Sequence, residues 1–177
     1  MRTIFVLRHA KSDWNDPTLD DFDRPLAPRG RASAPRIGRF LRDRGFVPER
    51  VLCSTAARAR ATWDLVAKEM GAAPPPAELS DALYLAPKQK ILAMIRALPD
   101  SCASVLVVGH NPGLHDLVLG LAGAQSNPKL LKRIERGFPT AAFAALVFDV
   151  DRWRNIADYS GRLETFVRSK SLEGAPG

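Results

Sequence analysis

The hydrophobic pattern begins with a short run at residues 3–7, Thr-Ile-Phe-Val-Leu, which is rich in β-branched and aromatic side chains. Such a run predicts a strand that is buried on both faces of a sheet. Residues 104–109 form a second run of this kind and give the clearest buried strand in the chain. Further strands are expected at residues 50–53, 77–79, 141–148 and 163–167. The pattern therefore indicates short strands spread along the whole chain.

Between these strands, apolar residues recur at helical spacing. Residues 29–44 show this spacing and are followed by Gly45, a stop signal, while Pro35 is expected to kink this helix or delay its start. Further helices are expected over residues 55–70, 88–98 and 114–121. Ser54 stands where it could cap the first of these three. Strands alternating with helices imply parallel crossovers, so we expect an α/β fold: a three-layer α/β/α sandwich with a mostly parallel central sheet.

No internal repeat or linker divides the chain, so residues 1–168 are expected to form a single domain. Residues 169–177 are expected to be a flexible C-terminal tail. The polar segment 11–28 is longer than the roughly 2–6 residues of an ordinary strand-to-helix link, and long loops of this kind tend to be functional or disordered. Five aspartates lie in it: Asp13, Asp16, Asp20, Asp21 and Asp23.

The balance of charges restricts the class of ligand. The 177 residues include 26 Lys and Arg against 19 Asp and Glu, a net charge of +7, which favours anionic partners such as phosphorylated proteins or acidic metabolites. No motif typical of nucleic-acid binding supports the reading of these charges as a nucleic-acid surface. A solvated helix face explains many of the arginines equally well.

The same composition bears on location and on the thiols. No apolar stretch approaches the ~18–20 residues that cross a bilayer, so no membrane partner is expected. A first strand at residue 3 leaves no room for a signal peptide, so we expect a cytoplasmic protein. Cys53 and Cys102 have neither zinc-site spacing nor a secretory context and are expected to be buried free thiols.

Three of the predicted strands end in residues suited to phosphate chemistry. The first ends in Arg8 and His9, the second leads into Ser54 and Arg58, and the third ends in Gly109-His110-Asn111. If these strands are parallel neighbours, their carboxyl ends meet in one crevice. Arginine grips phosphate oxygens with a planar fork, and a neutral imidazole is a competent nucleophile. The sequence therefore predicts a positively charged pocket able to transfer a phosphoryl group.

Each of these residues also has a purely structural interpretation. Arg58 could be a surface charge on its helix, and His110 could be a core histidine bonded to a carbonyl. His115 lies five positions after His110, which does not bring two helical histidines to one face, so we interpret it as structural or solvent-facing. Trp14 and Trp63 are expected to be packing residues.

Taken together, the motifs resemble a known family. Leu7-Arg8-His9-Ala10, the run from Ser54 through Arg58 to Thr62, and Val108-Gly109-His110-Asn111-Pro112 are similar to those of the histidine phosphatase superfamily, also called phosphoglycerate mutase-like. Asp23-Arg24-Pro25-Leu26 followed by Gly30, together with Ala10, resembles the bacterial phosphohistidine phosphatases of the SixA type. The resemblance covers residues 3 to about 122 and, more weakly, 141–148.

This resemblance implies a covalent mechanism. His9 would attack phosphorus and become phosphohistidine, and water would then release inorganic phosphate. Arg8, Arg58 and His110 would complete the catalytic phosphate pocket, with Asn111 as a further substrate-binding residue. The family's mechanism needs no cofactor and no metal. The sequence leaves open whether segments 11–28 and 125–140 gate this pocket.

One position departs from the family pattern. Members carry a glutamate general acid in a Leu-x-Glu context, and the nearest match here is Leu79-Ser80-Asp81, with a shorter carboxylate. Asp81 is therefore our candidate for the general acid. We also hypothesise that a site without a well-placed glutamate favours phosphoramidates, because an alkoxide needs a proton donor to leave whereas a protonated phosphohistidine ring does not.

The sequence thus predicts a phosphatase that hydrolyses phosphohistidine on a signalling or phosphotransfer protein. The alternatives are a small-molecule phosphomonoesterase with the same pocket, or a non-catalytic module that binds phosphate. The substrate is accordingly a phosphorylated protein or a small phosphorylated metabolite.

Overall fold

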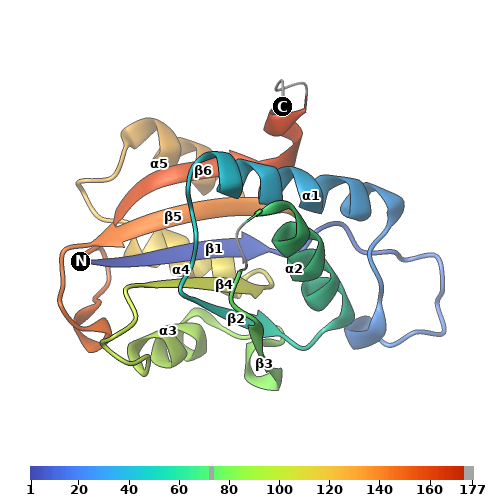
Figure 1. Ribbon diagram of the computed structural model, residues 1–177, viewed down its shortest axis with the longest axis horizontal. Helices are drawn as coiled ribbons and strands as arrows, with labels where there is room; N and C mark the ends of the chain where they lie inside the picture. Colours follow the sequence, from blue (N-terminus) through green and yellow to red (C-terminus); the bar gives the residue numbers. More distant parts are fainter. Residues whose placement is uncertain (72–73, 174–177) are drawn as a thin grey trace.

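The computed structural model describes residues 1–71 and 74–173. A sheet with the strand order β3-β2-β4-β1-β5-β6 runs through the centre (Figure 1). Its strands are β1 (Arg2–Arg8), β2 (Arg50–Ser54), β3 (Ala77–Ser80), β4 (Ser104–Gly109), β5 (Ala142–Phe148) and β6 (Arg162–Arg168). Strand β5 is antiparallel to both of its neighbours, and all other pairs are parallel. The predicted mostly parallel sheet is confirmed.

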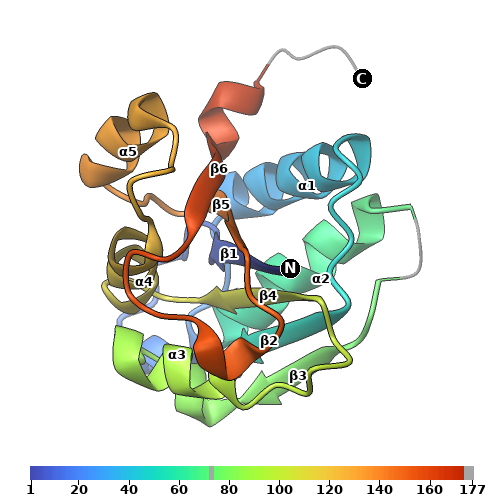
Figure 2. The ribbon, with the colours of Figure 1, turned by 90° about the vertical axis from the view of Figure 1, so that its left-hand side faces the viewer.

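Helices cover both faces of this sheet and complete the predicted three-layer sandwich. Helices α1 (Pro28–Asp43) and α2 (Ala57–Glu69) pack on one face. Helices α3 (Lys88–Arg96), α4 (Gly113–Leu121) and α5 (Pro128–Glu135) lie on the other (Figure 2). Short 3-10 helices follow several strands or loops: η1 (Asp21–Asp23), η2 (Asp81–Leu83), η3 (Trp153–Asn155) and η4 (Ser169–Leu172).

Alternation along the central strands divides the apolar side chains between two cores. In β1, Ile4 and Val6 face the core under α3 and α4, whereas Phe5 and Leu7 face the core under α1 and α2. All four side chains are buried, because successive residues of a strand point to opposite faces and both faces are covered. This is why the N-terminal run is apolar throughout rather than alternating.

Several boundaries differ from expectation for identifiable reasons. Ser54 is the last residue of β2 and does not cap α2, whose N-cap position is Ala56. Helix α1 starts at Pro28 without delay, since a proline at the first helical position already has the helical φ angle, and it continues through Pro35. Helix α5 was not predicted, although Asn127 caps it by accepting the Lys129 N–H at 3.0 Å.

The C-terminal segment was expected to be a flexible tail. Its first residues instead form η4, which packs against α1, and Glu173 pairs with Arg36 at 2.8 Å. The other residues of this prediction, 174–177, lie outside the described residues.

The remaining structural expectations concern the thiols and the surface. Cys53 and Cys102 are buried and free, and burial raises the pKa of Cys53 to about 12. Within residues 1–71 and 74–173, no helix has the length and apolarity to cross a bilayer. The same residues contain no cluster of three His, Cys, Asp or Glu side chains placed to share a metal ion.

Candidate active site

The three strands that end in chemically useful residues are neighbours in the sheet. Strands β2, β4 and β1 lie side by side and run parallel, with Arg8 paired to Gly109 in the β1–β4 register. Their carboxyl ends therefore open into one cavity of about 360 Å³. The described residues that line this cavity are Arg8, His9, Lys11, Ser12, Trp14, Asp21, Arg58, Leu85, His110, Asn111 and Thr140.

His9 is held by backbone on both sides. Its N–H donates to the Gly109 carbonyl at 3.1 Å, and its own carbonyl accepts the Ala141 N–H at 3.0 Å. The next residue is fixed as well, because the Ala10 N–H donates to Thr62 Oγ1 at 2.9 Å and this hydroxyl donates to the Arg58 carbonyl at 2.6 Å. Thr62, four residues after Arg58, thus ties the end of β1 to the first turns of α2.

The hydrogen bonds of His9 determine which ring nitrogen is available for chemistry. Nδ1 lies 2.7 Å from the Ala10 carbonyl oxygen, which can only accept, so Nδ1 carries the proton. Nε2 therefore keeps its lone pair, and the Arg58 Nε–H points at it from 3.3 Å. Burial, together with the charges of Arg58 and Arg8, lowers the pKa of His9 to about 4. A neutral imidazole with a lone pair facing a cationic cavity can attack an anionic electrophile.

His110 lies beside His9, with the ring centroids 5.2 Å apart. Its Nε2 is 2.8 Å from Ser54 Oγ, a hydroxyl that also accepts the Ala56 N–H at 3.3 Å. Because the described residues offer the Ser54 proton no other acceptor, Ser54 donates to Nε2 and leaves the proton of His110 on Nδ1.

The consequence is an unpaired donor on His110. Nδ1 is buried and has no hydrogen-bond partner among the described residues. Burial, followed by the neighbouring His9 and Arg58, lowers the pKa of His110 to about 3, so the ring is neutral. A neutral N–H without a protein acceptor can donate to an oxygen of a bound anion without any change of protonation.

Two guanidinium groups supply the positive charge. The Arg58 side chain is buried under Asp21: its Nη2 donates to Asp21 Oδ2 at 2.9 Å and its Nη1 donates to the Asp21 carbonyl at 2.6 Å. Arg8 Nη1 donates to the Phe138 carbonyl at 3.0 Å, and the Asn111 side-chain amide donates to the same oxygen at 2.8 Å. Burial and the nearby Arg58 lower the pKa of Arg8, but a guanidinium remains charged near neutral pH.

The carboxylate of this cavity comes from the loop between β1 and α1. Asp21 Oδ2 accepts from Tyr84 Oη at 2.5 Å as well as from Arg58, and Arg24 lies 3.7 Å from Oδ1. These partners, the Tyr84 hydroxyl first and then Arg58, lower the pKa of Asp21, so it is ionised at neutral pH. Sequence reasoning missed Asp21 as a site residue because nothing separates it from the other aspartates of segment 11–28.

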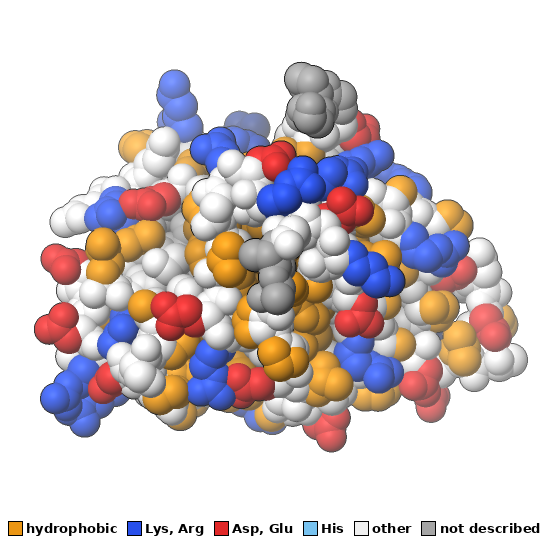
Figure 3. Space-filling model, in the orientation of Figure 1, with side chains coloured by type: hydrophobic (Ala, Val, Ile, Leu, Met, Phe, Trp, Pro, Cys, Tyr) orange, Lys and Arg blue, Asp and Glu red, His pale blue; other side chains and the backbone are white. Residues whose placement is uncertain are grey.

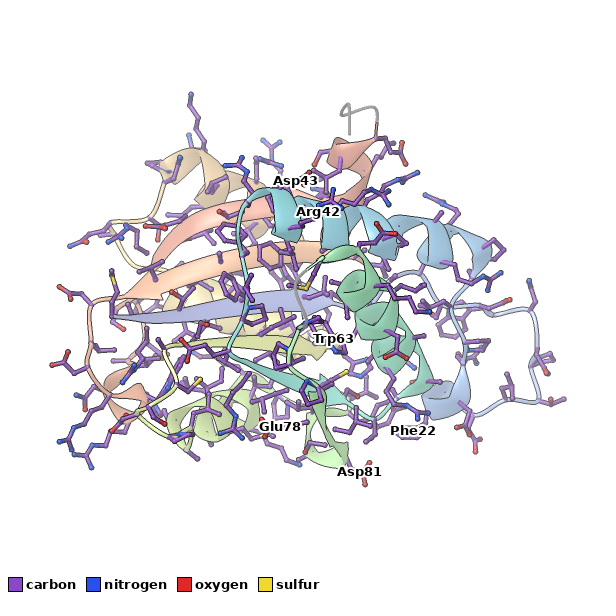
Figure 4. All side chains as sticks on the ribbon, in the orientation of Figure 1. Phe22, Arg42, Asp43, Trp63, Glu78 and Asp81 are labelled. Atoms are coloured by element: carbon purple, nitrogen blue, oxygen red, sulfur yellow. The ribbon has the colours of Figure 1, made fainter. Side chains whose placement is uncertain are left out.

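Asp81, our sequence-based candidate for the general acid, is not among the residues that line the cavity. It lies in η2 after β3 and points outward at the lower edge of the molecule (Figure 4), where it accepts a hydrogen bond from Thr55 Oγ1 at 2.5 Å. The strand that carries it sits at the edge of the sheet, beyond β2. Its carboxylate is exposed to solvent.

The structure also places the other residues that the sequence singled out. His115 is structural, since its Nε2 contacts the Ile134 carbonyl at 2.7 Å. Trp63 is 4% exposed and packs as expected. The same expectation is wrong for Trp14, which is 62% exposed at the mouth of the cavity and has the Arg24 guanidinium 3.9 Å above its ring.

The chain is similar in sequence and in fold to known proteins. The sequence profile of the histidine phosphatase superfamily (branch 1) matches residues 4–84. The chain has 31% identity to a solved SixA protein from Agrobacterium tumefaciens, with a TM-score of 0.76 over 94% of this chain and 97% of that one. The chain belongs to the histidine phosphatase superfamily. Its fold is accordingly phosphoglycerate mutase-like, as the resemblance implied.

Two further likenesses extend over nearly the full length of both partners. The structure of the protein histidine phosphatase SixA complexed with tungstate has a TM-score of 0.77 and 25% identity, covering 97% of this chain and 99% of that one. An uncharacterised protein of Mycobacterium leprae is 35% identical over 163 residues, which are 90% of this chain and 98% of that protein. Membership of the histidine phosphatase superfamily and the SixA likeness support a phosphatase hydrolase.

The two buried histidines predict a specific loss of stability in acid. Their pKa values lie below the ordinary 6.5, so protons bind the unfolded chain first and the free energy of unfolding falls as the pH drops below about 6.5. Each histidine should cost about 2 kcal/mol between pH 7 and pH 5. Urea unfolding at a series of pH values measures this loss of stability. The buffer is free of phosphate, because a bound anion would raise both pKa values.

The matched variants are His9→Asn and His110→Asn, each expected to flatten the decline, with His115→Asn as the control outside the cavity. Declines that run parallel in all four proteins would contradict the assignment of the acid sensitivity to the cavity.

The Ser54 contact predicts the tautomer of His110. Ser54→Ala removes the donor to Nε2, so the Nδ1–H form should lose its dominance, which nitrogen-15 chemical shifts of the ring report directly. Affinity for orthophosphate should fall about 10-fold, which is the typical effect of losing one hydrogen bond, here the one from His110 Nδ1–H to the anion. Ser126→Ala, a change at another buried serine, should alter neither quantity. An unchanged ring spectrum in Ser54→Ala would show that Ser54 does not set the tautomer.

Proposed function

We propose that this protein hydrolyses phosphohistidine through a covalent intermediate on His9. His9 Nε2 attacks phosphorus, the P–N bond of the substrate breaks, and its electron pair stays on the departing imidazole. Water then attacks the phosphorus on His9, the bond to Nε2 breaks, and inorganic phosphate leaves with the oxygen of that water. Arg8, Arg58 and the Nδ1–H of His110 would hold the phosphoryl oxygens, which is where charge must be stabilised.

The ionised state of Asp21 is the observation that favours phosphohistidine over phosphate esters as the substrate. An alkoxide leaving group, whose conjugate acid has a pKa of about 16, needs a proton from the enzyme. The one carboxyl group among the described lining residues is held as an anion by Tyr84, Arg58 and Arg24 and has no proton to give. A protonated phosphohistidine ring leaves as neutral imidazole and needs no such acid.

Asp21 has a second consequence for the reaction. Its two contacts with Arg58 fix the guanidinium beside His9 Nε2, and its anionic oxygen is a suitable acceptor for the proton of the attacking water. We therefore assign the catalytic carboxylate to Asp21, as a proton acceptor, rather than to Asp81, which the sequence suggested as a general acid. Asn111 and Arg8 both donate to the Phe138 carbonyl, which holds the two side chains side by side, where both would contact the phosphoryl group.

The test of the function is a trapping experiment. The protein is mixed with labelled phosphohistidine and quenched, and acid-labile, base-stable phosphate is expected on His9 and is expected to be absent from His9→Ala. Turnover of free phosphohistidine should exceed that of phosphoserine and of a sugar phosphate by at least ~100-fold in kcat/KM, the typical worth of a general acid. Trapping with equal turnover of the esters would favour the phosphomonoesterase. If neither trapping nor turnover is observed, the remaining candidate is the non-catalytic module that binds phosphate.

The carboxylates give a second prediction. Asp21→Asn should lower kcat/KM for phosphohistidine by about 10–100-fold, because Arg58 loses its anchor and the water loses its proton acceptor. Asp81→Asn is the matched control, the same chemical change outside the cavity, and should stay within about twofold of the wild type. A larger loss of kcat/KM in Asp81→Asn than in Asp21→Asn would show that the catalytic carboxylate is Asp81 in η2.

A further inference from the structure

A second cavity adjoins the one that contains His9. It has a volume of about 420 Å³ and lies between α1 and η4. Its described lining residues are Lys11, Arg29, Ala32, Ser33, Arg36, Thr140, Ser169, Lys170 and Glu173. We call it the α1–η4 groove. Lys11 and Thr140 line both cavities, so the groove continues the catalytic cavity along the outside of α1. Figures 1 and 2 both show η4 lying over α1.

The local packing explains why the two cavities meet. The Lys11 backbone crosses the first turn of α1 so closely that a Cβ on Gly30 would come within 2.2 Å of the Lys11 carbonyl oxygen. That carbonyl also accepts the Ala27 N–H at 2.8 Å. The chain leaving His9 is thereby held against the start of α1, and Lys11 stands on the boundary between the cavities.

The groove carries more positive charge than its own acids neutralise. Lys11, Arg29, Arg36 and Lys170 line it, against one acidic group, Glu173. Arg29, Ser33 and Arg36 recur at helical spacing and so share one face of α1. The ion pairs among residues 1–71 and 74–173 include none made by Lys11, Arg29 or Lys170. Figure 3 shows basic side chains gathered over α1.

The groove already holds one carboxylate. Glu173 Oε1 accepts from Arg36 Nη1 at 2.8 Å, and the glutamate side chain is 53% exposed. An exposed ion pair of this kind is worth little, so an incoming carboxylate can replace Glu173 at small cost. The contact of Glu173 with Arg36 thus shows that the groove can bind a carboxylate.

The rim on the catalytic side fits a protein surface rather than a small metabolite. Trp14 and Leu85 line the mouth of the catalytic cavity and are 62% and 51% exposed. Exposed aromatic side chains beside arginine are characteristic of protein interfaces. A small phosphorylated molecule seated on His9 would leave this apolar surface and the groove uncovered.

We propose that the α1–η4 groove is a docking subsite for an acidic segment of the phosphoprotein whose phosphohistidine enters the catalytic cavity. The proposal rests on the proposed function, because it places that phosphoryl group at His9. Asp or Glu side chains near the phosphohistidine would pair with Arg29, Arg36 and Lys170 and displace Glu173. The groove would thereby select among phosphoproteins by the charge that flanks the modified residue.

The experiment compares two synthetic peptides of equal length, each with one phosphohistidine, flanked by glutamates in one and by glutamines in the other. The measured quantity is the ratio of their kcat/KM values. At low salt we expect the wild type to prefer the glutamate peptide by about 10-fold, and we expect high salt to remove this preference. The double variant Arg29→Glu with Lys170→Glu should lose or reverse it.

Two further variants sharpen the test. Lys90→Glu with Arg154→Glu makes the same change of net charge at exposed positions outside the groove and should keep the wild-type ratio. Glu173→Gln should raise the ratio by about 2–3-fold, since it removes the internal competitor. Opposite effects from Glu173→Gln and the groove variant cannot arise from general loss of folding.

The outcomes separate the subsite from the proposed function. Failure to hydrolyse free phosphohistidine would overturn the function itself. Hydrolysis of free phosphohistidine with equal rates for the two peptides would overturn the subsite alone. If the groove variant instead loses a preference for a bisphosphorylated over a monophosphorylated sugar, while the peptides do not differ, the groove serves a small metabolite and the protein partner is wrong.

Discussion

The backbone ladder around His9 is the constraint on which the site depends. His9 continues β1 beyond its last strand residue, with one hydrogen bond to β4 and one to the residue preceding β5. A residue whose backbone is fixed in this way, and whose ring contacts the Ala10 carbonyl, would lose little freedom in the proposed attack on a substrate. The parallel strands β4 and β2 end at the same edge of the sheet, so His110, just after β4, and Arg58, in the first turn of the helix that follows β2, reach the ring of His9 without any long loop.

The electrostatic arrangement follows from this placement. Burial beside two arginines keeps both imidazoles neutral, which is the form that the proposed mechanism requires of His9, and it lets His110 donate without a second proton. An arriving phosphoryl group would supply the negative charge that the arginines lack. Before a substrate binds, Asp21 offsets part of the charge of Arg58, and the Tyr84 hydroxyl and then Arg58 keep Asp21 ionised by lowering its pKa. The described lining residues of the cavity therefore include three cations (Arg8, Arg58 and Lys11), two neutral imidazoles and one carboxylate.

Much of this could be predicted from the sequence because the relevant signals are local. Buried runs at β1 and β4, each followed directly by Arg8-His9 or by His110, fix both the strands and the side chains at their ends. Ser54 shows the limit of such reasoning. A serine before a helical pattern favours a cap, but here the strand extends through it, and its partner is a histidine 56 positions away.

The parts that could not be predicted depend on contacts between distant segments. Asp21 is selected from five loop aspartates by Tyr84 and Arg58, and neither partner is visible from the loop itself. Asp81 was the nearest match to the family's local pattern, yet it follows the edge strand β3 and lies outside the cavity. Helix α5 has only eight residues, too few for a strong periodic signal.

The division between sheet and loops also bears on selectivity. In the proposed mechanism the residues at the strand ends would contact only what every phosphoryl group has in common, so they would not distinguish one phosphorylated molecule from another. Discrimination must come from the groups that meet the leaving group and its surroundings. In this protein three of those groups, Asp21, Trp14 and Lys11, belong to the connection between β1 and α1, whereas Leu85 follows η2. Changes in this one connection could therefore alter the substrate while leaving the phosphoryl chemistry intact.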